Sequence, residues 1–191
     1  MTETNPATFN VEDWLTDAAL PEESATIYKR PDVVAELTDL KRRIDISTRA
    51  ADAEPTAGSK RPATLEREYE KLLRTFAGSA LTVYVRALTG DGLRTMKASH
   101  EERTKELTPA DANLEFGFDL LAAAIIAVKP AGAKERTLTT FSTDQVKALR
   151  DAIGEAQMQL ILAARQQAQN GVPTVDADFL HKPSGTEAGQ G

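Results

Sequence analysis

The chain has 191 residues, which is enough for one domain or two small ones. Its 29 acidic and 23 basic side chains give a net charge of −6, which argues against a nucleic-acid binder, because such proteins neutralise phosphates with Lys and Arg. The chain has no cysteine, so disulfides, thiolate nucleophiles and cysteine-type zinc sites are excluded. Aromatic residues make up only 5% of the sequence, and we therefore expect a mostly aliphatic core.

The N-terminal segment, residues 1–23, is polar and acidic and does not have the composition of a signal peptide. Within it, Val11, Trp14 and Leu15 share one helical face, and Asn10 can cap the first turn. We expect a short amphipathic helix that contains the single tryptophan of the chain.

Residues 24–88 are expected to form a strand–hairpin–strand unit. Residues 24–29 and 81–87 are predicted strands, the second because apolar and polar residues alternate strictly along it. Between them, helices are predicted over 31–49 and 64–78, joined by a loop rich in Ala, Pro and Gly.

The two predicted helices carry matching apolar stripes with steps of four, three and four residues, which is typical of helices that pack on one partner. The stripes are Val33, Leu37, Leu40 and Ile44 on the first helix, and Leu65, Tyr69, Leu72 and Phe76 on the second. This predicts an antiparallel helical hairpin. Because the hairpin returns the chain to its start, the strands around Ile27 and Val83 should be antiparallel neighbours.

Residues 89–171 are predicted to be helical. A weak helix is expected around Leu93 and Met96, and the cap at Thr108 starts a helix that should run to about Val128.

Another helix should begin with a capping box between Ser142 and Gln145, and Gly154 should bend or break the chain. Residues 172–191 form a predicted flexible tail. Together these patterns predict an α+β, mostly helical fold: a small antiparallel strand pair at the base of a helical hairpin, followed by a C-terminal helical bundle.

The sequence shows no catalytic constellation. His100 and His181 have no histidine at metal-ligand spacing, and we expect His100 to be solvated. Asp176 and Asp178 form a DxD pair, but they lie in the predicted tail, which offers no rigid support for a cation. No phosphate-binding glycine loop or nucleophile elbow occurs. We therefore expect no enzyme activity, no cofactor and no bound metal.

Several segments resemble those of a known protein family, both in their residues and in their order along the chain. They read TIYKRPDVVAELTDLKRRID, LTVYVRALTGDG, FSTDQVKALRDAIGEAQMQLILAARQQAQNG and VDADFLHKPSG. In this order, from about Val11 to Gly185, the chain resembles the tail assembly chaperones of long non-contractile-tailed, siphovirus-type actinobacteriophages.

The resemblance implies a protein of the host cell cytoplasm during infection. It implies that the chain binds the phage tape measure protein, keeps it soluble, promotes tail-tube assembly and is absent from the mature virion. Further implied partners are the major tail tube protein and a frameshifted longer form of this chain. Self-association of the chain is a separate expectation. Neither nucleic acid nor membrane is an expected partner; the longest apolar run, residues 120–128, falls short of the ~20 residues that span a bilayer.

A chaperone of helical clients needs exposed apolar strips. The candidate partner-binding residues are Val11, Trp14, Leu15, Leu121, Ile125, Phe179 and Leu180. The same side chains, Trp14 above all, can instead anchor their own segment to the domain. An alternative function is a structural head–tail connector or tail-completion protein of the virion, because a long hairpin serves ring formation equally well.

Overall fold

The computed structural model of the protein describes residues 10–16, 18–53 and 63–171. Its helices are α1 (Val11–Thr16), α2 (Val33–Ala53), α3 (Ala63–Gly78), α4 (Gly90–Arg103), α5 (Pro109–Ala124), α6 (Thr143–Ile153) and α7 (Glu155–Asn170). Its strands are β1 (Glu22–Tyr28), β2 (Ala80–Arg86), β3 (Ile125–Pro130) and β4 (Thr137–Leu138). The fold is α+β and mostly helical, as the sequence predicts. None of the helices in these ranges has the length and apolar character needed to cross a membrane.

The strands form one antiparallel sheet in the order β1-β2-β3-β4. Ala25 of β1 lies opposite Val83 of β2, so the predicted pairing of the first two strands is confirmed. On its other side, Val83 lies opposite Val128 of β3. The register shifts between Tyr84 and Val85, which marks an irregularity of the β-bulge type in the centre of the sheet.

The third strand corrects the sequence analysis. The helix predicted to run to Val128 ends at Ala124, and β3 begins at the next residue. Ile125, Ile126 and Val128 are β-branched, which favours a strand, and β2 supplies the partner that such a strand needs. The sheet therefore has four strands where the sequence predicted a pair, and the region after residue 88 is not entirely helical.

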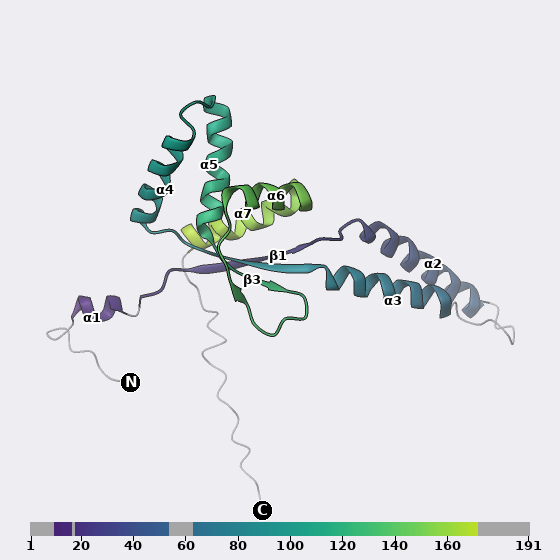
Figure 1. Cartoon of the computed structure of the whole chain (residues 1–191). Coiled ribbons are helices and arrows are strands. Elements are labelled where there is room, and N and C mark those ends of the chain that lie inside the picture. The colour runs from purple at the N-terminus through teal and green to yellow at the C-terminus, as the bar shows by residue number, and fades with distance from the viewer. Residues whose placement is uncertain (1–9, 17, 54–62, 172–191) are drawn as a thin grey trace, which may run out of the picture.

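The four helices α4–α7 gather on one face of this sheet (Figure 1). Side chains on that face are buried, among them Ile27, Val83 and Val85. The intervening Thr26 and Thr82 lie opposite one another on the other face, where their hydroxyl oxygens are 3.1 Å apart. The alternation of apolar and polar residues thus matches a sheet with one covered face and one open face.

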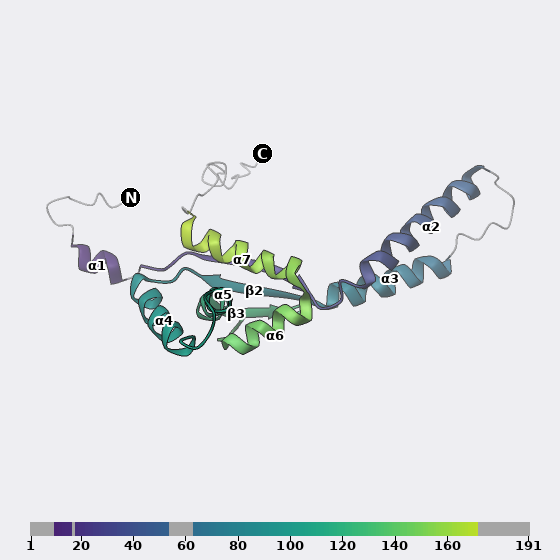
Figure 2. The same ribbon diagram turned by 90° about the horizontal axis from the view of Figure 1, so that it is seen from above.

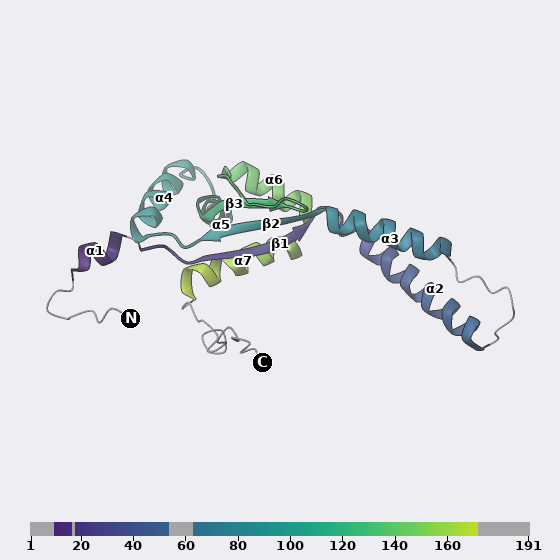
Figure 3. The same cartoon turned by 90° about the horizontal axis from the view of Figure 1, so that it is seen from below.

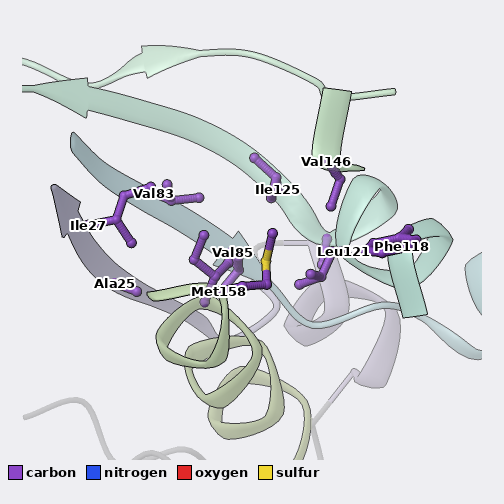
Figure 4. Close-up of a cluster of buried hydrophobic side chains, with 11 residues drawn as sticks. Ala25, Ile27, Val83, Val85, Phe118, Leu121, Ile125, Val146 and Met158 are labelled. Carbon is purple, nitrogen blue, oxygen red and sulfur yellow. The ribbon is translucent and has the colours of Figure 1, made fainter. Parts of the chain in front are cut away.

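A single core joins the first two strands to the helices that follow them (Figure 4). The buried cluster consists of Ala25, Ile27, Val83, Val85, Phe118, Leu121, Ala124, Ile125, Val146, Met158 and Ile161. Apart from Phe118 and Met158 these side chains are aliphatic, as the composition predicts. The expected units 24–88 and 89–171 therefore share one hydrophobic core.

The helices α2 and α3 lie against one another and form an arm that extends beyond the ends of β1 and β2 (Figures 2 and 3). Val33, Leu37 and Leu40 are buried in the seam between the two helices. The remaining stripe residues, Ile44, Leu65, Tyr69, Leu72 and Phe76, are half-buried. The predicted hairpin is present, and α2 continues past its predicted end at residue 49.

The arm is attached to the sheet by aromatic stacking. The ring of Phe76 stacks on that of Tyr28 with a centroid distance of 4.2 Å and an interplanar angle of 10°. Beside this pair, the backbone N–H of Lys29 donates to the carbonyl of Ser79 at 3.0 Å and continues the strand pairing by one step. The base of the arm is therefore fixed to the ends of β1 and β2.

Local signals in the C-terminal half are confirmed. Thr108 accepts a hydrogen bond from the backbone of Asp111 and caps α5, and Ser142 with Gln145 forms a complete capping box at α6. Gly154 has a φ of 80°, a conformation that favours glycine, and it separates α6 from α7. The tail predicted over 172–191 lies outside the described residues.

Candidate partner-binding groove

An apolar groove opens on the helical layer between α5 and α7. Its volume is about 150 Å³. It is lined by Leu114, Gly117, Phe118, Leu121, Arg150, Glu155, Met158 and Leu162. Pockets for small organic ligands usually measure roughly 300–1,000 Å³, so this groove matches one large apolar side chain rather than a metabolite.

The depth of the groove depends on Gly117, in the middle of α5. No atom lies within 4 Å of the position that a Cβ on Gly117 would occupy, so the space above this residue is empty. Leu121, one turn further on, is 1% exposed and lies at the buried side of the groove, whereas Leu114, one turn before, is 55% exposed at its mouth. The wall on α7 comes from Met158 and Leu162.

Cationic side chains border this apolar floor. The guanidinium of Arg150 lies 5.5 Å from the ring centroid of Phe118, and the ammonium of Lys147 lies 5.9 Å from it. Arg150 also approaches Glu155 with an Nε–Oε2 distance of 3.3 Å, and Lys147 binds Glu115 at 2.6 Å. Each cation at the rim thus has a carboxylate partner, and the mouth of the groove is close to neutral.

The structure distributes the predicted partner-binding residues over three places. Leu121 and Ile125 are 1% and 2% exposed, which corrects the expectation that both are exposed: Ile125 belongs to the core and does not line the groove, whereas Leu121 lines the buried side of the groove. The helical face predicted to be exposed carries Leu114 instead, which is the exposed large apolar residue of α5. Phe179 and Leu180 lie outside the described residues.

The short helix α1 presents its apolar residues to solvent. Val11, Trp14 and Leu15 are 54%, 65% and 54% exposed. The backbone N–H of Glu12 donates to Oδ1 of Asn10 at 3.0 Å, so the predicted cap is present. Figures 1 and 3 show α1 at the end of the sheet opposite the arm. Trp14 is therefore not an anchor within the described part of the chain.

A polar cluster that was not predicted from the sequence links α4, α5 and α6. Asp119 accepts hydrogen bonds from Thr143 at 2.6 Å, from His100 at 2.8 Å and from Arg103 at 2.5 Å. His100 is thus largely enclosed rather than solvated, with a side chain that is 10% exposed. The signal was present in the spacing: His100 and Arg103 share one face of α4, and Glu115 and Asp119 share one face of α5.

The cluster has the electrostatics of a structural network. Burial alone would raise the pKa of Asp119, but the hydrogen bonds from Thr143, His100 and Arg103 outweigh it and hold that pKa below its ordinary value. The hydrogen bonds from Lys147 and then Arg103 lower the pKa of Glu115 in the same way.

An open hollow of about 430 Å³ lies beside the polar cluster. Both oxygens of Asp119 already accept hydrogen bonds, so its carboxylate is a poor general base. Over the residues that the structure describes, no three His, Asp or Glu side chains converge in a way that could hold a metal ion.

Neither a protein-family model, nor a curated protein, nor a solved structure matches this chain.

Proposed function

We propose that this protein is a tail assembly chaperone that binds an amphipathic helix of a phage tape measure protein and keeps that client soluble during tail-tube assembly. The observation that carries the binding mode is the apolar groove between α5 and α7. The identity of the client rests on the resemblance of the segment order to siphovirus-type tail assembly chaperones.

The groove suits a helix better than an extended peptide or a small molecule. A helix presents apolar side chains at intervals of three and four residues, and a space of about 150 Å³ receives one of them. Leu114 at the mouth provides a second apolar contact one turn along the client. Burying one large apolar side chain stabilises a complex by roughly 1.5–3 kcal/mol, so each contact is weak enough to be released.

Charge plays a secondary part in this proposal. The chain carries −6, which favours basic stretches of the client and disfavours acidic ones. At the groove itself, Arg150 and Lys147 are paired with carboxylates, and the local contact is mainly apolar. We therefore expect complex formation to weaken only modestly as salt rises, because apolar burial is not screened as exposed ion pairs are.

The proposed action is binding without catalysis, in the host cytoplasm, by a protein that leaves before the virion is complete. The test is co-expression of the tape measure protein with this chain, followed by measurement of the soluble client and by pull-down. Leu114→Asp should remove most of the solubilising effect. Leu160→Asp is the matched control, because Leu160 is 50% exposed on α7 and does not line the groove.

Two results would end this proposal. One is a client that stays equally insoluble with and without the wild-type chain. The other is an equal loss of client solubilisation in the two Asp variants, since that would show that binding does not depend on the groove. Thermal unfolding followed by circular dichroism establishes beforehand that both variants are folded.

The projecting arm favours a second candidate, a head–tail connector or tail-completion subunit of the virion. Head-to-tail contacts between identical subunits generate a ring when the rotation closes, and a projecting arm offers a surface for such a contact. Mass spectrometry of purified particles separates the two functions, because a connector is retained in the particle and a chaperone is not.

A further inference from the structure

One flank of the arm carries an exposed apolar pair. Val34 follows the buried stripe residue Val33, and Leu73 follows the stripe residue Leu72; their side chains are 43% and 44% exposed. Because α2 and α3 run in opposite directions, residues that directly follow a stripe residue on either helix lie on the same side of the seam. The two exposed side chains therefore stand beside one another near the base of the arm.

The same flank continues toward the tip with two opposite charges. Lys41 follows the stripe residue Leu40, and Glu66 follows the stripe residue Leu65, so both occupy the same positions one heptad further out. Both side chains are exposed. We call Val34, Leu73, Lys41 and Glu66 the arm flank: it is apolar near the base and charged further out. By the same rule the exposed Asp45 and Glu70, which follow the stripe residues Ile44 and Tyr69, lie on this side of the seam as well, but further from the seam.

The arm also carries almost no net charge, whereas the rest of the chain is acidic. Residues 33–50 and 63–78 contain seven basic and six acidic side chains, a net charge of +1. Because the whole chain carries −6, the remainder carries −7. The negative charge that makes two copies repel one another therefore lies outside these arm residues, and the net charge near zero of the arm residues permits association.

The two arm helices bury the α2 stripe residues Val33, Leu37 and Leu40 but enclose the stripe of α3 only in part. No residue described in α3 is buried, and its stripe residues Leu65, Tyr69 and Leu72 remain half-buried against α2. A layer of two helices covers only one side of each helix, and further helices are needed to enclose such a seam. The helical hairpin of a second copy of the chain supplies two such helices.

We propose that the arm flank binds the same flank of a second copy of this chain. The two arms lie side by side and point the same way about a two-fold axis that runs along them. In this arrangement α2 of one copy faces α3 of the other, so Val34 meets the partner's Leu73 and Lys41 meets the partner's Glu66. The symmetry makes each contact twice, as an isologous interface requires. The proposal is independent of the client and of the groove.

Sedimentation velocity over a range of protein concentrations tests the association. We expect a concentration-dependent dimer for the wild-type chain and an association constant at least tenfold lower for Leu73→Glu. Leu138→Glu is the control, because Leu138 is 76% exposed and lies on β4, outside the arm. Lys41→Glu and Glu66→Lys should each weaken the dimer, and the double variant should restore it, because the pairing is then only reversed.

Cross-linking tests the geometry, since the natural chain has no cysteine. Under oxidising conditions a mixture of Val34→Cys and Leu73→Cys chains should yield more disulfide-linked dimer than either variant alone, and Leu138→Cys should yield little. A wild-type chain that stays monomeric at all concentrations would overturn the proposal, as would a dimer insensitive to Leu73→Glu. If the chain is monomeric and Leu73→Glu abolishes client binding instead, the arm flank is a client site and self-pairing is wrong.

Discussion

The side chain of Gln157 binds both backbone groups of Tyr28, a residue 129 positions earlier in the chain. Its amide nitrogen donates to the carbonyl of Tyr28 at 2.9 Å, and its amide oxygen accepts the Tyr28 N–H at 2.6 Å. Tyr28 is the last residue of the edge strand β1, where the arm begins. Gln169, near the other end of α7, binds both backbone groups of Leu88 in the same way, at 2.9 and 3.2 Å. Side chains near both ends of α7 therefore hydrogen-bond to the backbone of Tyr28 and Leu88.

The first prediction concerns this contact. Gln157→Ala should lower the free energy of unfolding by about 1–3 kcal/mol, because it leaves two partly buried backbone groups without partners. Hydrogen exchange at the Tyr28 amide should accelerate. Gln159→Ala is the matched control on the same helix: the Gln159 side chain is exposed and, among the described residues, hydrogen-bonds to Glu155 alone, so its loss should cost about 0.5 kcal/mol or less. Equal effects in the two variants would contradict this role of Gln157.

The second prediction concerns the seam of the arm. Leu40 is 3% exposed, and Leu40→Ala should destabilise the protein by roughly 2–4 kcal/mol, through lost apolar burial and a residual cavity. Ile46, on the same helix but 60% exposed, provides the comparison: Ile46→Ala should change stability by about 0.5 kcal/mol or less. Chemical denaturation measures both. A Leu40 variant as stable as the Ile46 variant would mean that the seam does not hold the helices together.

The third prediction uses the depressed pKa of Asp119. A carboxyl whose pKa is lower in the folded state stabilises the fold above its unfolded-state value of about 3.9, and this stability is lost as the pH falls through the folded-state pKa. Asp119→Asn should therefore cost about 1–3 kcal/mol at pH 7, where the wild type holds the ion pair with Arg103 and the hydrogen bonds from Thr143 and His100.

The difference between wild type and Asp119→Asn should shrink as the pH falls below 4, because the wild-type carboxyl then becomes neutral as well. Urea denaturation at several pH values between 3 and 7 measures it. A cost that stays constant over this range would show that the ionised carboxylate contributes nothing.

The fourth prediction separates stability from binding at the groove. Gly117→Ala should stabilise the protein by up to about 1 kcal/mol, because alanine favours a helix interior and its Cβ meets no atom within 4 Å. Gly117→Leu should fill the groove and weaken capture of the tape measure protein. Thermal unfolding and pull-down are measured on the same preparations. A Leu variant that captures the client as well as the wild type would place the contact elsewhere.

Features set by neighbouring residues could be predicted from the sequence. The heptad spacing of Val33 and Leu37 depends only on the order of residues along one helix. The cap at Thr108 and the break at Gly154 are local in the same sense. The pairing of β1 with β2 could also be predicted, because a helical hairpin returns the chain to its start and so brings the segments before and after it together. What these signals share is that each is complete within a few dozen residues.

The tertiary structure alone decided the outcomes that depend on distant partners. The run from Leu120 to Val128 suits a helix or a strand, and it divides at Ala124 because β2 offers a pairing edge to the residues that follow. That division buried Ile125, which the sequence placed on a partner-binding surface. The enclosure of His100 required Asp119 from one helix and Thr143 from another to meet in one place. A sequence specifies which side chains can be donors or apolar contacts, but folding determines which of them remain free to meet a partner.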